Sequence, residues 1–186
     1  MTKMPKLYVE DPRHQMPSVY LPETVYAQAI GSFIIVCTDA LVMNRTQRTI
    51  ALVQRIARPM RGFWCMGGRR QAGERAEASV RRCFQRETQL ALPEKRFHFL
   101  GAYEYHWKDR AQEPQDTGSH NLSYQFTVEL DADERAFVAG HLDPREYDPA
   151  FGLQDFTRPE LVAAGAHAVI LDWYDTLFPV PHGSGQ

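Results

Sequence analysis

The order of apolar and polar positions along the chain predicts a domain built from strands and helices. In 122–130 the apolar residues Leu122, Tyr124, Phe126 and Val128 alternate with polar ones, as in a strand with one buried face. Short apolar runs bounded by glycine or polar turns predict further strands at 32–37 continuing through 41–43, at 49–53, at 62–66 and at 97–105. The polar residues 44–48 separate the first two strands and predict a hairpin.

Helical periodicity is clearest in the middle of the chain. Between Gly73 and Leu90 the apolar residues Ala76, Val80 and Phe84 recur every four positions with charged residues between them. This spacing predicts one amphipathic helix, which places its apolar side against the rest of the domain.

Two later helices are predicted to begin at capping residues. Asp131 precedes a helix that reaches about His141, and Thr157 with Glu160 has the capping-box pattern of a helix that continues to Ala164. The apolar segment 167–178 is predicted to be a strand that turns into a short helix.

The order of these elements predicts the fold class and the domain limits. Strands, a central helix, more strands and terminal helices form a mixed α/β (α+β) layer fold rather than alternating βαβ units. The prolines in 1–30 predict an extended N-terminal arm, with a short helix at 22–30. One domain is expected over 31–180, followed by a flexible tail at 181–186.

Composition excludes several function classes. The 186 residues are 44% apolar and 24% charged, which is typical of one globular domain. No apolar run approaches 18 residues and the N-terminus is polar, so neither a membrane-spanning helix nor a secretory signal is predicted. Three cysteines without metal-ligand spacing favour a reducing cytoplasm. The net charge of −2 argues against a strongly basic nucleic-acid binder.

The kind of basic residue is more informative than the net charge. Only four of the 21 basic residues are lysine, so arginine predominates, and eight arginines fall between Arg55 and Arg82. The guanidinium fork suits phosphate and carboxylate groups. The cluster therefore indicates a local anion site.

The segment 67–90 carries the most specific pattern. It resembles the Nudix box of the Nudix hydrolases, G-x5-E-x7-R-E-U-x-E-E-x-G-U, where U is a bulky apolar residue. Six defined positions match, namely Gly68, Glu74, Arg82, Phe84, Glu87 and Leu90. The resemblance implies a Nudix fold, an α/β/α sandwich around a mixed β-sheet.

Three positions depart from the box. Cys83 and Arg86 stand where glutamates are expected, and Gln89 replaces the glycine. Glu87 is therefore the one remaining carboxylate at the end of the box, and the implied metal site has fewer oxygen ligands than usual. The pattern also resembles the GDP-mannose mannosyl hydrolase branch, which lacks the same two glutamates and cleaves a C–O bond.

The likeness to this branch continues outside the box, from about Gly31 to Phe178. The resembling segments are 39–44, 55–59 with 62–64, Arg69, 101–109 and 118–126. The branch takes a glutamine metal ligand and a histidine general base from a late loop. Here residues 142–156 contain no histidine, which leaves Glu146, Asp148, Gln154 and Asp155 as unranked candidates.

Roles for individual residues follow from the resemblance. It implies that Mg²⁺ (or Mn²⁺) is held by the Gly67 carbonyl and Glu87. The expected catalytic residues, which contact the diphosphate or orient carboxylates, are Arg55, Arg69, Arg82 and Glu74. The expected substrate-binding residues are Asp39, Arg55, Arg69 and Tyr105. Cys83 is expected to be buried and inert, and His98, His106 and His120 to be structural.

Two functions of different classes remain open at this stage. The first is a Mg²⁺-dependent hydrolase acting on a nucleoside-diphosphate derivative, such as a GDP-mannose-like nucleotide sugar, by C–O or by pyrophosphate cleavage. The second is a catalytically weakened or inactive module that binds a nucleotide. Both readings predict a small-molecule ligand, with neither nucleic acid nor membrane as partner. A homodimer is a candidate assembly.

Overall fold

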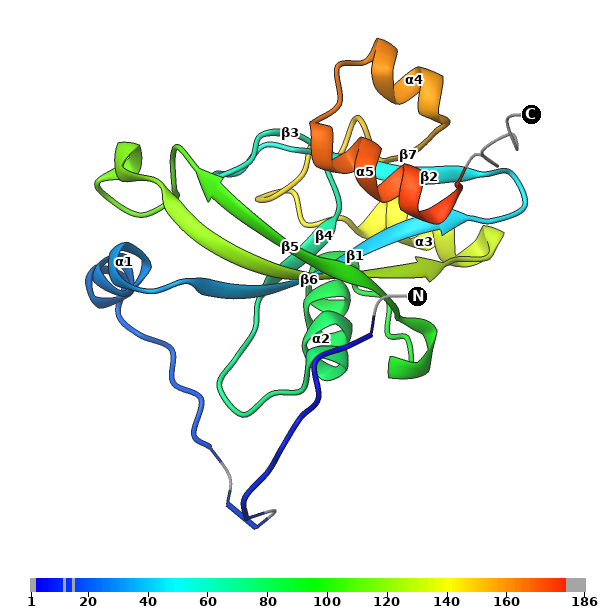
Figure 1. Cartoon of the computed structure of the whole chain (residues 1–186). Helices are drawn as coiled ribbons and strands as arrows, with labels where there is room; N and C mark the ends of the chain where they lie inside the picture. Colours follow the sequence, from blue (N-terminus) through cyan, green and yellow to red (C-terminus); the bar gives the residue numbers. More distant parts are fainter. Residues whose placement is uncertain (1–2, 12, 15, 180–186) are drawn as a thin grey trace, which may run out of the picture.

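A mixed seven-stranded sheet organises the chain in the computed structural model, which describes residues 3–11, 13–14 and 16–179 (Figure 1). The strands are β1 (Ile35–Asn44), β2 (Thr49–Arg55), β3 (Gly62–Trp64), β4 (Met66–Arg69), β5 (His98–Trp107), β6 (Ser119–Glu129) and β7 (Leu153–Phe156). The helices are α1 (Glu23–Ser32), α2 (Ala76–Thr88), α3 (Ala132–His141), α4 (Arg158–Ala163) and α5 (Ala168–Leu177).

Strand β1 lies at the centre of the sheet. It pairs in parallel with β6 along nine residues, and the antiparallel strands β4 and β2 occupy successive stretches of its other edge. Strand β3 continues the sheet beyond β2, and β5 continues it beyond β6. The glycine pair of β4 therefore lies directly beside the middle of β1.

Two apolar clusters lie on opposite faces of the sheet. Val80 and Phe84 of α2 belong to one cluster, and Val138 of α3 joins it. On the other face Ile170 and Trp173 of α5 pack with residues of β1 and β2. Figure 1 shows α2 on one side of the sheet with α4 and α5 on the other, which is the expected three-layer arrangement.

Most local predictions hold in the structure. The 44–48 turn joins an antiparallel hairpin, with Arg48 at a positive φ of 53°. Asp131 caps α3 through a capping box with Glu134, and Thr157 caps α4 through one with Glu160. The central helix ends at Thr88, where Gln89 adopts the left-handed conformation that the glycine of the box pattern would take easily.

Four local predictions were wrong. The single strand expected at 62–66 is interrupted at Cys65 and forms β3 and the start of β4. Ser32 ends helix α1 instead of opening a strand, and β1 begins only at Ile35. The segment 167–178 is the helix α5, whose buried Ile170, Trp173 and Tyr174 follow helical spacing; apolar residues at neighbouring positions obscured that period. The short strand β7 pairs with β2 inside a segment expected to be a loop.

The N-terminal arm contacts the domain at two of its methionines. Residues 3–22, where described, contain no helix or strand, and α1 follows them. Met4 packs against the apolar cluster under α2, and Met16 lies against Gly73. No helix in the described residues is long and apolar enough to cross a bilayer. The tail expected at 181–186 lies outside the described residues.

Replacement of Phe84 by alanine tests the packing of α2. Phe84 is 1% exposed and meets Phe97 edge to face at 5.6 Å between ring centroids. We expect Phe84→Ala to lower the free energy of unfolding by about 3–5 kcal/mol, measured by urea denaturation. The exposed neighbour Gln85 is the control, and Gln85→Ala should change stability by less than about 0.5 kcal/mol. Equal effects would mean that α2 is not packed as described.

Candidate active site

A cavity of about 240 Å³ lies beside the glycine pair of β4. Residues from α1, β1, β2, β4, α2 and the loop before β7 contribute to its wall, among them Tyr26, Asp39, Arg55, Gly67, Glu87 and Tyr147. Several residues that are far apart in the sequence therefore meet at one place. Of the residues expected to be functional, the cavity brings together Asp39, Arg55, Gly67, Arg69, Glu87 and Tyr105.

Gly67 allows β4 to approach β1 closely. Gly67 is the cross-strand partner of Asp39, and a Cβ atom on Gly67 would lie 1.8 Å from Asp39 Oδ1 and 2.7 Å from the Thr38 carbonyl oxygen. Any side chain at this position would push the two strands apart. The need for glycine here is therefore steric.

Glu87 lies at the end of α2 and is almost completely buried, with 3% exposure. Its Oε2 accepts hydrogen bonds from the Gly67 N–H at 2.8 Å and from the Tyr147 hydroxyl at 2.5 Å. Burial raises the pKa of Glu87 above its ordinary value, although Arg86 and Tyr147 stabilise the charged form. Burial and the Glu87 charge raise the pKa of Tyr147 as well, so the phenol remains a donor.

Arg86 provides the positive charge closest to Glu87. Its Nη2 donates to Glu87 Oε1 at 2.5 Å and to the Gly67 carbonyl oxygen at 3.0 Å. These are the two groups expected to hold a divalent cation. The oxygens suit Mg²⁺ chemically, but the guanidinium lies between them, so they fit a cation only when Arg86 moves away.

Glu74 and Arg82 form a brace between α2 and the loop that precedes it. Arg82 donates to both carboxylate oxygens of Glu74, at 2.7 and 2.8 Å, and to the Arg69 carbonyl at 3.0 Å. Burial raises the pKa of Glu74, but hydrogen bonds from Arg82 and the Gln71 N–H outweigh this and hold it below its ordinary value. Neither Glu74 nor Arg82 lines the cavity.

Two further arginines enter the cavity from different elements. Arg55, at the end of β2, pairs with Glu146 at 2.9 Å. Arg69 lies over the ring of Tyr26 in α1, with its guanidinium carbon 4.3 Å from the ring centroid. The Nε atom of Arg55 is buried and has no hydrogen-bond partner in the described part of the chain.

Asp39 and Tyr105 add polar groups on the sheet side of the cavity. Asp39 is 8% exposed and accepts a hydrogen bond from the Ser123 hydroxyl. Burial raises its pKa to about 6, and the bond from Ser123 acts in the opposite direction. The buried Tyr105 hydroxyl has no partner among the described residues. Both groups therefore add polar atoms to the cavity wall.

The structure separates the four late-loop candidates. Glu146 lines the cavity, whereas Asp148, Gln154 and Asp155 do not. Asp148 accepts a bond from the Ala150 N–H in a turn, and Asp155 pairs with Arg135. Glu146 is thus the late-loop carboxylate that a cavity ligand can reach.

The sequence analysis assigned no site role to several cavity residues, among them Tyr26, Tyr147 and Arg86. Tyr26 lies in the segment that was assigned to the arm, and its position over Arg69 depends on how α1 packs. Tyr147 directly follows the candidate Glu146. Its aromatic ring in an otherwise polar loop was a weak indication that it is buried near the site. No pattern along the sequence connects either tyrosine to 67–90.

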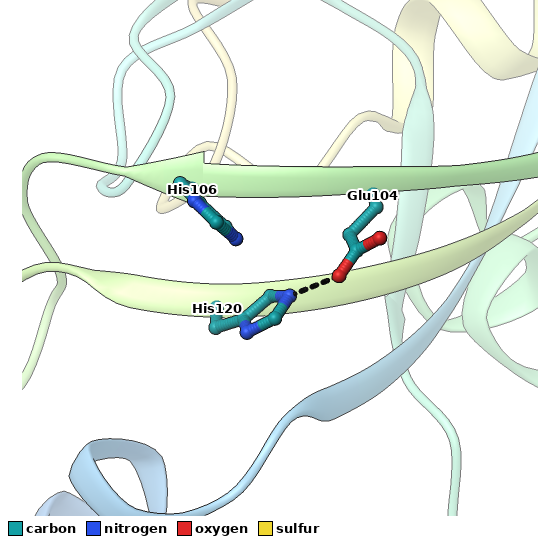
Figure 2. Close-up of side chains that lie close together, drawn as sticks. All are labelled: Glu104, His106 and His120. Carbon is teal, nitrogen blue, oxygen red and sulfur yellow. Dashed lines mark hydrogen bonds and ion pairs between the residues drawn. The ribbon is translucent and has the colours of Figure 1, made fainter.

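A second group of chemically active side chains lies outside the cavity lining (Figure 2). His106 and His120 are directly paired on β5 and β6, and their ring centroids are 4.3 Å apart. Glu104 lies on the same face and is 2.6 Å from His120 Nε2. The sequence analysis treated His106 as structural because it has no partner at ligand spacing, and His120 as a residue that braces its strand.

The chain matches one family model and resembles several solved structures in fold. The family model described as NUDIX domain matches residues 35–174. A MutT NUDIX hydrolase structure from Burkholderia pseudomallei is similar with a TM-score of 0.58 and 17% identity, covering 78% of this chain and 98% of that chain. The MutT protein of Methanosarcina mazei Go1 gives a TM-score of 0.56 and 16% identity, covering 77% and 92%.

A NUDIX hydrolase structure from Nitrosomonas europaea is similar with a TM-score of 0.53 and 17% identity, covering 77% of this chain and 88% of that chain. At these identities the likeness shows the fold. No curated protein has a significantly similar sequence.

Removal of the Glu74 charge tests the brace. We expect Glu74→Gln to lower stability by about 1–2 kcal/mol at pH 7, because the ion pair with Arg82 is lost and the amide offers one acceptor oxygen in place of two. A carboxyl with a lowered folded-state pKa stabilises the fold above its unfolded pKa and loses this effect as pH falls through the folded value. The difference from the unmodified protein should therefore shrink below pH 4.5.

Glu77 in the first turn of the same helix supplies the control for this measurement. Its contact with Arg75 is longer, at 3.6 Å, and both side chains are more exposed. Chemical denaturation between pH 3 and 8 should show little effect of Glu77→Gln at any pH. A pH-independent loss in Glu74→Gln would contradict the electrostatic account.

Proposed function

Because the chain belongs to the NUDIX family of hydrolases, we propose that it hydrolyses a nucleoside-diphosphate derivative in the cavity described above. The observation that carries this proposal is the convergence of Arg55, Arg69 and Arg86 from three separate elements on one cavity. Three guanidinium groups around a small space match the charge and the oxygen-rich shape of a diphosphate.

The aromatic and polar walls suit the remainder of such a ligand. Tyr26 and Trp107, which are partly exposed, line the cavity and give it aromatic surface for a base or a sugar ring. Asp39 and the Tyr105 hydroxyl, which has no partner in the described ranges of the chain, offer hydrogen bonds to hydroxyl groups. These contacts support a nucleotide sugar as the substrate, in agreement with the resemblance to GDP-mannose mannosyl hydrolases.

A divalent cation is part of the proposal. NUDIX hydrolases generally use such an ion, and the Gly67 carbonyl with Glu87 would hold Mg²⁺ or Mn²⁺ here once Arg86 is displaced. When bound, the ion supplies positive charge at the diphosphate. Arg55 and Arg69 stabilise the charge that develops on the leaving phosphate, and Glu146 is a candidate to orient the attacking water.

A binding module without turnover is the second candidate. Cys83 and Arg86 replace carboxylates, and both oxygens of Glu87 already accept hydrogen bonds from protein groups. Such a site can bind an anion while it activates water poorly. For either function we propose that the protein is located in a reducing cytoplasm, which agrees with the free thiols of Cys37, Cys65 and Cys83.

A substrate screen distinguishes these functions. Nucleoside-diphosphate sugars are incubated with Mg²⁺ or Mn²⁺ in ¹⁸O-labelled water, and the products are separated. C–O cleavage yields free sugar carrying the label and a nucleoside diphosphate, whereas pyrophosphate cleavage yields sugar phosphate and a nucleoside monophosphate. We expect C–O cleavage. Saturable nucleotide binding without products would identify a binding module.

Arginine variants test whether the cavity is the reaction site. We expect Arg55→Ala and Arg69→Ala to lower kcat/KM by about 30- to 1000-fold, equal to about 2–4 kcal/mol of transition-state stabilisation. Arg81 is exposed on α2 and lies outside the cavity lining, so Arg81→Ala is the charge-matched control and should be nearly silent. Equal losses in all three variants would show that only net charge matters.

A further inference from the structure

The guanidinium of Arg86 occupies the position between the two groups that would hold a cation. One nitrogen, Nη2, donates to both the Gly67 carbonyl and Glu87 Oε1. A divalent ion that bound these oxygens would lie close to the same nitrogen. Two positive charges at such a distance in a partly buried site repel each other strongly. Arg86 and the ion therefore cannot use these oxygens together.

The protein is shaped to accept Arg86 in this place. A Cβ atom on Gly68 would lie 2.8 Å from Arg86 Nη2 and 3.5 Å from Nη1, so glycine provides the necessary space. Glu87 needs a counter-charge because an unpaired buried carboxylate is costly. Arg86, the residue directly before Glu87 in the helix, supplies that charge.

The remaining part of the Arg86 side chain is available to a ligand. The side chain is 49% exposed and lines the cavity. In the described part of the chain its hydrogen bonds come from Nη2 alone. A guanidinium has five N–H donors, so the N–H groups on Nε and Nη1 remain able to donate to a ligand. A diphosphate in the cavity can therefore attract Arg86.

We propose that Arg86 competes with the divalent cation for the Gly67 carbonyl and Glu87, and that a bound diphosphate displaces Arg86 in favour of the cation. The second part rests on the proposed function. In the ligand-free protein Arg86 neutralises Glu87 and keeps cation affinity low. When phosphate oxygens draw the guanidinium away, the two oxygens become free. Anion and cation then raise each other's affinity, since linkage is reciprocal.

Cation binding to the ligand-free protein tests the first part. Free Mn²⁺ is followed by electron paramagnetic resonance with the unmodified protein, Arg86→Met, Arg86→Lys and the control Arg81→Met. We expect Arg86→Met to bind Mn²⁺ at least about tenfold more tightly, within the usual range of coupling between sites. Arg86→Lys keeps the charge and should gain less, and Arg81→Met should match the unmodified protein.

A double variant assigns the gain to this site. Glu87→Gln in the Arg86→Met background should remove the tighter binding, whereas His120→Ala in that background should leave it unchanged. Equal Mn²⁺ affinity in Arg86→Met and the unmodified protein, with both shown to be folded by thermal denaturation, would overturn the proposal. This measurement needs no substrate, so its outcome does not depend on whether the protein is a hydrolase.

Nucleotide binding tests the second part. In the presence of a chelator, a nucleoside diphosphate should bind the unmodified protein, and Arg86→Met should weaken this binding by about tenfold, measured by calorimetry. Added Mg²⁺ should restore most of the affinity of the variant. Binding that requires Mg²⁺ in the unmodified protein would refute the displacement of Arg86 by the anion.

A separate inference follows from the paired histidines of β5 and β6. One nitrogen of His106, one of His120 and a carboxylate oxygen of Glu104 all lie within 4.8 Å of one another, on one face of the sheet (Figure 2). Direct cross-strand pairing holds the two imidazoles side by side without the need for a loop to fold around them. None of the three residues lines the cavity.

The donor set selects the class of ion. Two imidazole nitrogens and one carboxylate suit Zn²⁺ and similar transition metals, whereas Mg²⁺ prefers oxygen ligands alone. We infer that these side chains form a Zn²⁺-type site with an open position for water. The contact between His120 Nε2 and Glu104, at 2.6 Å, would be replaced by bonds from both groups to the ion.

Zn²⁺ calorimetry tests this second site. His106→Ala and His120→Ala should each lower Zn²⁺ affinity by at least about tenfold. Loss of a group that only supports a metal ligand already lowers affinity by about that factor, and loss of the ligand itself should lower it further. His98 is exposed on the same strand and outside the group, so His98→Ala is the control. Glu87→Gln should have no effect. Unchanged affinity in His120→Ala would refute the site.

Discussion

The cavity depends on one electrostatic constraint, the burial of the Glu87 carboxylate. Removing such a group from water is costly unless both oxygens receive strong hydrogen bonds. The donors come from three parts of the chain, the Gly67 N–H of β4, the Tyr147 hydroxyl of the late loop and the Arg86 guanidinium of α2. The same requirement therefore holds the helix end, the glycine pair and the loop in one arrangement.

The other carboxylates around the site follow the same rule. Glu74 has Arg82, and Glu146 has Arg55. These two acids each receive an arginine, whereas Asp39 accepts from the Ser123 hydroxyl. A guanidinium has more donors than one carboxylate can accept. The excess donors favour an anion, so the charge distribution supports diphosphate binding before a metal ion is considered. Replacement of two helix carboxylates by Cys83 and Arg86 moves the site further in this direction.

Local spacing was sufficient to predict the helix on which Arg82 and Glu87 lie. Glu74, Arg82 and Glu87 were assigned from the resemblance of 67–90 to the Nudix box. Helical geometry places Arg82 and Glu87 at a known relative angle, whereas Glu74 lies in the loop before the helix. The capping residues Asp131 and Thr157 were identified for the same reason, because a helix start is determined within four residues. Segment 167–178 was misassigned, since its neighbouring apolar residues obscured the helical period.

The amino-acid sequence by itself determined the fold class, the helix that carries the box and the concentration of arginine near it, because all three depend on periodicity and composition. Tertiary structure decided which groups meet. The direction of Arg86 depends on the space above Gly68, and Tyr26 reaches Arg69 through the packing of α1. His106 and His120 become neighbours through the register of β5 and β6. Register and long-range packing join residues whose separation along the chain carries no periodic signal.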